Sequence, residues 1–400
     1  MTFVLGNKEK QITNIPKEVL WCKNCVLSNQ RPRVIFNKEG ICSACVNLEY
    51  KSKINWQDRE KSLKKLLDLH RNKNGDWDVI VPSSGGKDSG FVAHKLKHEY
   101  NMNPLLVTWS PLKYTDIGLQ NFRNLNDNGF LNIKCTPNGE IHRKLARLSF
   151  EEFGDAFHVF VLGQMYFPIH MALKFNIKLI FYGENGELEY AGDPNSVDKP
   201  YKDLIEDESW INGYLKGTTL QELLKYALEK KDYISQSLID DADLKFYNPP
   251  NHNEMKQKDI SKIHYFAYYH KWNPQENYYY CVENTGFKPN PERTEGTYSK
   301  YASIDDKMDG FHYYMRYIKF GLGRCMEDAA HEIRDGHITR EEGMALMSKY
   351  EGEFPKKYFD EFLDYLQITE DHFWKVVDAW RSKHLWHQKN GKWILKNPVK

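Results

Sequence analysis

Residues 79–97 read VIVPSSGGKDSGFVAHKLK, and this stretch decides the fold. A short β-branched strand runs into two serines and two glycines, and a helix is expected directly afterwards. Gly85 and Gly86 lack a Cβ, so the backbone there can approach an oxyanion closely. The bare N–H groups at the start of a helix favour negative charge, and Lys87 adds a positive charge. The turn therefore predicts a phosphate-binding loop.

This loop differs from the two commoner nucleotide motifs. GxxxxGK[ST] has four residues between its glycines and a hydroxyl after the lysine, whereas here the glycines are adjacent and Asp88 follows Lys87. GxGxxG also fails. Asp88 would repel a bare phosphate, so we expect it to hold a cation or to orient the loop. A glycine-rich strand-to-helix turn without a ligand is the plain alternative.

Strand-like and helix-like segments alternate around the loop. Strands are predicted at 78–81, 103–110, 131–137 and 177–187, and helices at 55–70, 91–99, 117–130, 139–153 and 156–175. Such alternation predicts an α/β fold with a parallel sheet and helices on both faces. The final stretch, 303–400, is predicted to be mainly helical, with a capping box at Thr339–Glu342 and a weaker one at Ser303–Asp306. The predicted domains are 1–55, 56–290 with an irregular insert at about 192–290, and 291–400.

Two CxxC pairs, Cys22/Cys25 and Cys42/Cys45, lie ahead of the predicted sheet. Each pair can hold one metal ion from a tight turn, and four thiolates suit tetrahedral zinc. Four protein ligands leave no open position, so the predicted zinc site in residues 1–55 is structural. A redox pair or an iron–sulfur cluster is the rival interpretation.

The bulk composition narrows the class of protein. The chain has 400 residues, a net charge of +1 and 14% aromatic residues, which favours a folded protein of two or three domains. The near-neutral charge gives no support for a nucleic-acid or membrane partner. No apolar run approaches the roughly 20 residues of a membrane span, and the first residues lack the pattern of a signal peptide. We therefore expect a cytoplasmic protein.

SGGKDS resembles the SGGxDS loop of the ATP-pyrophosphatase (PP-loop, adenine nucleotide alpha hydrolase-like) superfamily, whose members cleave ATP between the α and β phosphates. With the CxxC pairs, FYGENGELEYAGD at 181–193 and ERTEGTYSKYASIDDKMDGFHYYMRYIKFGLGRCMEDA at 292–329, nearly the whole chain resembles the N-acetyl sugar amidotransferase family. That family serves bacterial surface-polysaccharide synthesis, including lipopolysaccharide O-antigen and pseudaminic acid. The resemblance implies an α/β PP-loop core, a zinc-binding N-terminal module and a mainly helical C-terminal region.

The resemblance also implies a reaction. An N-acetyl group of a nucleotide-activated sugar becomes an acetamidino group through an adenylated imidate and ammonia, with release of AMP and pyrophosphate. ATP and Mg²⁺ are implied, together with structural Zn²⁺. Ammonia would come from a separate glutaminase of the imidazole-glycerol-phosphate-synthase type. The chain itself has no G-x-C-x-G elbow, because Gly323-Arg-Cys-Met-Glu327 lacks the last glycine, and residue 2 is Thr where a nucleophilic Cys would stand.

Site residues follow from the resemblance and from the rule that ligands bind at the carboxyl ends of parallel strands. The expected ATP-binding residues are Pro82, Ser84, Gly85, Gly86, Lys87, Asp88, Ser89, Thr108, Gly183 and Asn185. The expected catalytic residues are Lys87, Asp88 and Glu184. Candidate contacts to the sugar nucleotide are Glu187, Arg293, Lys300 and Arg324, any of which can equally be an ordinary surface charge.

Two other functions remain open at this stage. A tRNA-thiolating enzyme shares the SGGxDS loop and needs a reactive cysteine, for which Cys135 is the obvious candidate. A non-catalytic nucleotide sensor is the second, and release of AMP and pyrophosphate would exclude it.

Overall fold

The computed structural model describes residues 10–190, 199–206, 218–230, 234–239 and 242–399. Its centre is a six-stranded sheet of order β3-β2-β1-β4-β6-β5, in which only β5 runs antiparallel to its neighbour. The strands are β1 (Val79–Pro82), β2 (Pro104–Trp109), β3 (Asn132–Cys135), β4 (Leu179–Tyr182), β5 (Tyr201–Asp203) and β6 (Lys262–Tyr265). The mostly parallel sheet confirms the α/β class.

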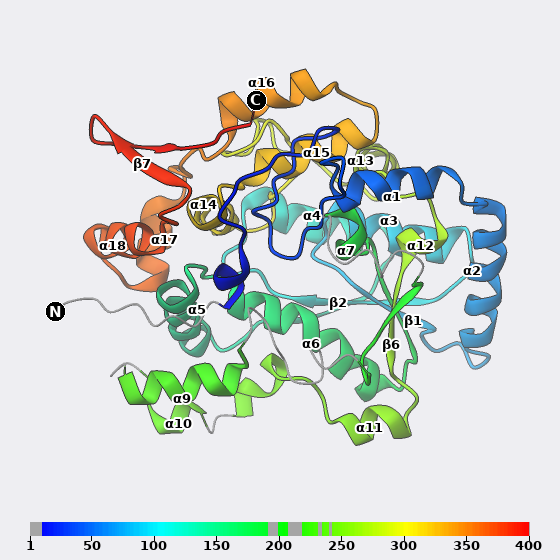
Figure 1. Cartoon of the computed structure of the whole chain (residues 1–400). Helices are drawn as coiled ribbons and strands as arrows, with labels where there is room; N and C mark the ends of the chain where they lie inside the picture. Colours follow the sequence, from blue (N-terminus) through cyan, green and yellow to red (C-terminus); the bar gives the residue numbers. More distant parts are fainter. Residues whose placement is uncertain (1–9, 191–198, 207–217, 231–233, 240–241, 400) are drawn as a thin grey trace.

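The central strands are continuous apolar runs because helices cover both faces of the sheet. Alternate side chains enter different cores. Ile80 and Val107 pack with α5 (Gly139–Phe153) and α6 (His158–Phe175), whereas Val79 packs on the other face with α3 (Lys87–His98). Figure 1 shows α6 along one face of the strands and α3 with α4 (Asp116–Asp127) along the other.

The strand order places the sequence motif at a reversal point. The chain runs from β1 outward to β2 and β3, and then returns to β4 on the opposite side of β1. The loops after β1 and β4 therefore separate at the carboxyl ends of two adjacent parallel strands, where open α/β sheets bind ligands.

The remaining helices surround this core. Before and beside the sheet lie η1 (Lys10–Asn14), α1 (Ser43–Ser52), α2 (Trp56–His70), α7 (Gly186–Glu189), α9 (Leu220–Lys230), α10 (Gln236–Ile239), η3 (Ala242–Tyr247), α11 (His252–Gln257), α12 (Phe266–Tyr269) and α13 (Pro274–Asn284). The C-terminal helices are α14 (Asp309–Phe320), α15 (Arg324–Arg334), α16 (Arg340–Tyr350), α17 (Phe359–Leu366) and α18 (Glu370–Trp380). In the described residues no helix has the length and apolarity that a bilayer crossing requires.

One expectation about local structure is incomplete and another is wrong. The stretch at about 192–290 is predicted to be an irregular insert of short, interrupted helices; its described part contains such helices, α12 and α13 among them, but also β5 and β6, and β6 extends the parallel sheet. Its four residues, KIHY, are too short and too polar to give a strand signal. The weak capping box at Ser303–Asp306 caps no helix, because α14 begins at Asp309 and Ser303 has a φ of +54°.

The C-terminal region is mainly helical, as predicted, and the capping box of Thr339 and Glu342 is confirmed at the start of α16. Beyond α18 the chain forms a hairpin that the sequence analysis missed. Its strands β7 (Trp386–Lys389) and β8 (Lys392–Leu395) pair only with each other in the described structure. Figure 1 shows the hairpin, in red, extending from the body of the protein above α17 and α18.

The two ends of the chain share one core. The four N-terminal cysteines and Val26 are buried against Phe320, Met326 and Ala329 of α14 and α15, and against Met347 of α16. The cysteine segment is therefore packed onto the C-terminal helices.

Candidate active site and metal centre

The loop after β1 is held in a conformation that requires glycine. Gly85 has a φ of +90°, and a Cβ on it would lie 2.6 Å from the backbone nitrogen and Cα of Phe122 in α4. L-residues rarely adopt this φ, and here the helix backbone also fills the space. Gly85 thus lets the loop lie directly against α4.

Hydroxyl groups fix the rest of the loop. Ser83 Oγ accepts from Gly85 N at 3.2 Å and lies 3.0 Å from Ser89 Oγ, which ties the loop to the first turn of α3. Ser84 Oγ donates to Asp305 Oδ2 at 2.5 Å, linking the loop to the C-terminal region. Gly86 is the N-cap of α3 and supplies no side-chain cap. The first-turn N–H groups of α3 therefore face a loop preorganised for an external acceptor.

A cavity of about 470 Å³ opens over this loop. It brings together most of the residues that the sequence analysis selected at the strand ends, and one from the C-terminal region. These are Pro82, Ser84, Gly86, Lys87, Asp88, Ser89, Gly183, Glu184 and Arg324. Pro82 ends β1, and the next five lie in the loop after β1 and the first turn of α3. Gly183 and Glu184 directly follow β4, and Arg324 begins α15.

Other selected residues lie elsewhere. Thr108 is buried, and its hydroxyl donates to Ser83 O and lies 3.0 Å from Asn132 Oδ1, so it supports the loop from behind. Asn185 is buried beside the cavity without lining it. Arg293 pairs with Glu353 at 2.6 Å, and Lys300 donates to a backbone carbonyl at 2.9 Å; both are outside the cavity. Glu187 lies in α7, and its side chain is outside the described structure.

Carboxylates crowd the loop end of the cavity. Asp88 binds Lys87 Nζ through Oδ2 at 2.5 Å, while its Oδ1 is buried with no hydrogen-bond partner. Burial, reinforced by the charge of Asp88, raises the pKa of Glu184 to about 7. Burial likewise raises the pKa of Asp305 to about 6, against the opposing effect of the Ser84 hydrogen bond. Together, these groups favour a bound cation at the loop end.

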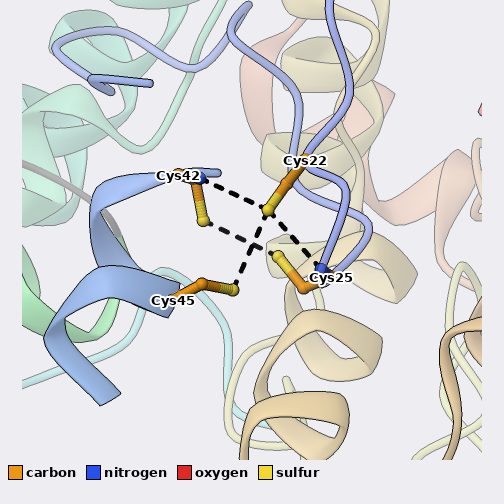
Figure 2. A group of neighbouring side chains, drawn as sticks. All are labelled: Cys22, Cys25, Cys42 and Cys45. Atoms are coloured by element: carbon orange, nitrogen blue, oxygen red, sulfur yellow. Dashed lines mark hydrogen bonds between the residues drawn. The ribbon is translucent and has the colours of Figure 1, made fainter. Parts of the chain in front are cut away.

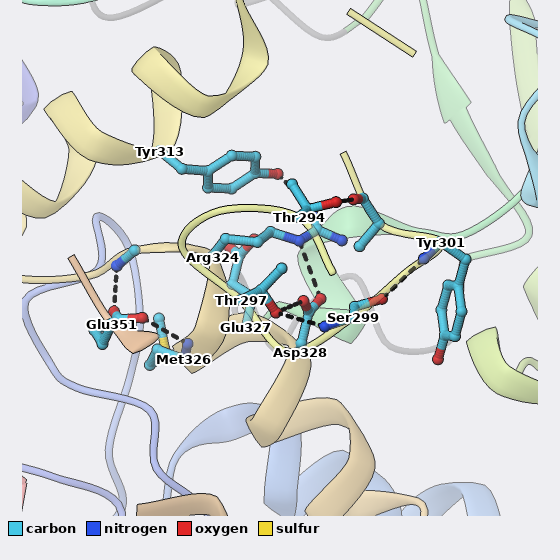
Figure 3. Close-up of polar contacts among 12 residues, drawn as sticks. Thr294, Thr297, Ser299, Tyr301, Tyr313, Arg324, Met326, Glu327, Asp328 and Glu351 are labelled. Carbon is cyan, nitrogen blue, oxygen red and sulfur yellow. Dashed lines mark hydrogen bonds and ion pairs between the residues drawn. The ribbon is translucent and has the colours of Figure 1, made fainter. Parts of the chain in front are cut away.

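One face of α15 forms the opposite wall. Arg324 donates from Nε to Asp328 Oδ1 at 3.0 Å and from Nη1 to Tyr313 Oη at 2.6 Å, and Thr297 Oγ1 donates to Asp328 Oδ2 at 2.5 Å (Figure 3). His331, further along α15, lines the cavity with a buried Nε2 that has no partner. Burial holds the pKa of His331 well below its ordinary value, so its imidazole is neutral.

Sequence reasoning selected Arg324 but missed Asp328, His331 and Asp305. The spacing of Arg324, Asp328 and His331 is i, i+4, i+7, which places them on one helical face, and this pattern was available. Asp305 lies inside the stretch that the sequence pattern assigns to a helix cap. Its position under Ser84 depends on a contact across most of the chain, which no local pattern signals.

The four cysteines form a closed cluster whose sulfur atoms all lie within 4.8 Å of one another. Cys22 and Cys45 Sγ are 3.9 Å apart, and Cys25 and Cys42 Sγ are 3.7 Å apart (Figure 2). A tetrahedron with Zn–S bonds of about 2.3 Å has sulfur–sulfur edges of roughly 3.8 Å. The cluster therefore fits zinc, with the four thiolates as its complete ligand set.

Positive side chains surround this cluster. Arg340 Nε donates to the carbonyls of Cys22 and Cys25 at 3.4 and 3.2 Å. The hydrogen bond with Cys22 raises the pKa of Cys25, but hydrogen bonds with Cys42 and Cys45 lower it, and the charge of Arg334 at the end of α15 adds a smaller lowering effect, so that the pKa of Cys25 is lowered on balance. Arg334 also donates to Glu189 O at 2.8 Å, next to the chain that follows β4. The helix that lines the cavity is thus anchored on the cysteine cluster.

The cysteine required for thiolation is not in the cavity. Cys135 ends β3, outside the described cavity lining, and burial raises the pKa of its thiol. Cys281 donates its thiol to Lys87 O at 3.0 Å from behind α3, and burial raises its pKa to about 12. Neither is poised as a thiolate.

The comparisons with known proteins cover parts of the chain. Residues 295–400 match the family model "LPS biosynthesis protein WbpG-like, C-terminal domain", where LPS is lipopolysaccharide. The chain is also 32% identical over 88 residues to an uncharacterised protein of Methanocaldococcus jannaschii. That alignment covers 22% of this chain and spans only 31% of the length of the relative. The C-terminal region, which supplies α15 to the cavity, is therefore similar to proteins of lipopolysaccharide biosynthesis.

Proposed function

We propose that this protein is an ATP-dependent, AMP-forming amidotransferase of lipopolysaccharide biosynthesis. It converts an N-acetyl group of a nucleotide-activated sugar into an acetamidino group. The observation that carries the proposal is the joining, in one cavity, of the SGGKDS loop at the sheet reversal point and α15 of the WbpG-like region. The first part suits a nucleotide phosphate, and the second supplies the wall for a sugar substrate.

The loop suits the pyrophosphate end of ATP. First-turn N–H groups of α3, the serine hydroxyls and Lys87 are the donors that oxyanions need. The buried, unpaired Oδ1 of Asp88 is a hard oxygen ligand, so Asp88 would hold Mg²⁺. Because Lys87 and Arg324 are each already paired with an aspartate, the phosphates require such a cation to offset the surrounding carboxylates. When bound, Mg²⁺ would neutralise charge on the departing pyrophosphate.

The reaction has a clear chemical logic. An amide carbonyl is a poor electrophile, and its oxygen is a poor leaving group. Transfer of AMP from ATP to that oxygen forms a C–O–P linkage and releases pyrophosphate. Ammonia then adds to the same carbon, AMP departs with the oxygen, and a C–N bond replaces the C–O bond. With a pKa of about 7, Glu184 is suited to take the proton that the attacking nitrogen must lose.

The proposal includes a separate ammonia source. The sequence lacks both glutaminase signatures, so the chain alone should use ammonium salts and not glutamine. The placement of Cys135 outside the cavity disfavours the thiolation alternative.

The test is product analysis. The purified protein is incubated with ATP, Mg²⁺, ammonium chloride and a panel of nucleotide-linked diacetamido sugars. We expect AMP, pyrophosphate and a sugar nucleotide lighter by the difference between oxygen and an imino group. Asp88→Asn should abolish turnover, whereas Lys300→Ala, outside the cavity, should not. ADP as the spent nucleotide would refute the proposal, and complete loss of activity in Cys135→Ser would revive thiolation.

A further inference from the structure

The C-terminal hairpin carries positive charge that the fold does not neutralise. Residues 381–400 contain no Asp or Glu, and their basic residues are Arg381, Lys383, Lys389, Lys392, Lys396 and Lys400. Arg381 pairs with Asp378 at the end of α18. Lys389 and Lys392, at the tip, have no carboxylate partner in the described structure and are exposed. Such a concentration of one charge stands out in a chain of net charge +1.

The pairing of the strands makes this charge costly. Lys389 lies directly opposite Lys392 across the ladder, on either side of the Asn390-Gly391 turn. Like charges at directly opposed positions destabilise an antiparallel pair. A two-stranded hairpin has little stability of its own to offset this repulsion. The opposed pair Lys389 and Lys392 disfavours the hairpin, and no contact in the described structure compensates for it. A conflict of this kind points to a function, which here would be contact with an anionic partner outside the chain.

The register defines the surface that the partner would meet. Trp386 and Leu395 face the body of the protein, where the Trp386 indole donates to Ile318 O at 2.9 Å. Side chains alternate along strands, so the opposite, outer face is defined by His387, Lys389, Lys392 and Ile394. Ile394 is 41% exposed, and on the inner side Trp393 is 40% exposed beneath the guanidinium of Arg381.

Basic residues interleaved with the exposed Ile394 on the outer face suit one surface in particular. Lysines are attracted to anionic headgroups, while an aliphatic side chain settles at the boundary between headgroups and acyl chains. The hairpin projects from the molecule (Figure 1), so its tip can reach a flat surface. It also lies within the region that matches the family model of a WbpG-like lipopolysaccharide-biosynthesis protein.

We propose that the outer face and tip of the β7–β8 hairpin dock the protein on an anionic lipid bilayer. This docking is peripheral and electrostatic, so it is compatible with the absence of a spanning helix from the described residues. It does not depend on the ATP chemistry, because the hairpin contributes no residue to the described cavity lining.

The test is sedimentation of the full chain with vesicles of phosphatidylcholine alone or with added phosphatidylglycerol, at low and high salt. We expect binding only to the anionic vesicles and weakening with salt. Each lysine near such a surface contributes about fivefold in partitioning, so Lys389→Glu/Lys392→Glu should weaken binding by at least roughly 25-fold. The matched control, Lys61→Glu/Lys65→Glu on exposed positions of α2, changes the net charge equally and should weaken binding far less.

A second variant, Ile394→Ser, tests the apolar contribution without changing charge and should weaken binding several-fold. Thermal melting of all variants should match the wild type, because these side chains are exposed. Equal binding to neutral and anionic vesicles, or retention of binding by the Lys389/Lys392 variant, would overturn the proposal. So would failure to bind any vesicle combined with hairpin-dependent self-association, which would assign this face to a second copy of the chain.

Discussion

Replacing Gly85 with alanine tests whether the loop after β1 is held by its contact with α4. The φ of +90° is unfavourable for alanine, and the new Cβ would lie 2.6 Å from the Phe122 backbone. Gly75 provides a matched control, because it has a φ of +82° and nothing lies within 4 Å of the place that a new Cβ would take. Gly75→Ala therefore measures the backbone cost alone, and the difference between the two variants measures the clash.

The expected magnitudes follow from this geometry. A left-handed conformation costs an L-residue about 1–2 kcal/mol, and the reduced freedom of the unfolded chain offsets about 0.4–1 kcal/mol of it. Gly75→Ala should thus lose about 1 kcal/mol. In Gly85→Ala the contact must lengthen by about 0.8 Å against helix backbone, and overpacking of this kind adds about 1–3 kcal/mol. We expect a total loss of about 2–4 kcal/mol.

The assay is urea unfolding of both variants, followed by nucleotide binding under conditions where both are folded. A displacement of the loop by nearly 1 Å should weaken ATP-dependent turnover by about 100-fold in Gly85→Ala and leave Gly75→Ala unaffected. Equal stability of the two variants would show that the contact with α4 does not constrain the loop. Normal turnover by a folded Gly85→Ala protein would refute the assignment of the loop to phosphate binding.

Three further predictions address the metal centre, the pH dependence and the buried charges. Cys22→Ser should release zinc, measured by elemental analysis, and lower the melting temperature because the cluster shares a core with α15; unchanged metal content would contradict the site. Between about pH 4.5 and 7 folded Glu184 binds more protons than the unfolded chain, so wild-type stability relative to Glu184→Gln should fall as pH rises through this window, and parallel melting curves would refute the raised pKa. Arg316→Met removes the 2.6 Å partner of buried Glu327 and should cost about 3–5 kcal/mol in urea unfolding, part of which Arg316→Met/Glu327→Leu should recover; no recovery would mean that the arginine acts through its hydrogen bonds to Leu322 O and Gly323 O and not through the ion pair.

The parts of the fold that local sequence predicts are those with local causes. The buried apolar run at 104–109 predicts a strand, Thr339 predicts a helix start, and Gly85 and Gly86 predict a tight turn. In each case the signal lies within a few residues. The spacing of the two CxxC pairs likewise predicts that the four cysteines form one cluster. The mostly parallel sheet was predicted from the alternation of strands and helices, because parallel neighbours need a long crossover connection and a helix usually supplies it. The antiparallel pairing of β5 with β6, whose connection is also helical, was not predicted.

The parts that local sequence missed depend on distant partners. The sequence KIHY of β6 has no strong strand pattern of its own. It is extended because its backbone pairs in parallel with the edge of β4, a contact between segments distant in sequence. Asp305 gains its place from Ser84, and Arg293 is taken out of the cavity by Glu353, which lies in another part of the chain. Charge alone could not tell Arg293 from Arg324, since only their partners differ.

The shared core of the cysteine cluster and α15 has a consequence for biosynthesis of the chain. Cys45 leaves the ribosome long before Phe320 and Met347, the residues that later cover it. Translation proceeds at roughly 5–20 residues per second, so this interval lasts on the order of tens of seconds. During that time the four thiols are not yet covered by the apolar side chains of the C-terminal helices. Early capture of a metal ion would protect them from oxidation while the remainder is translated, so the yield of intact protein in growing cells should depend on zinc supply even though the reaction chemistry does not consume it.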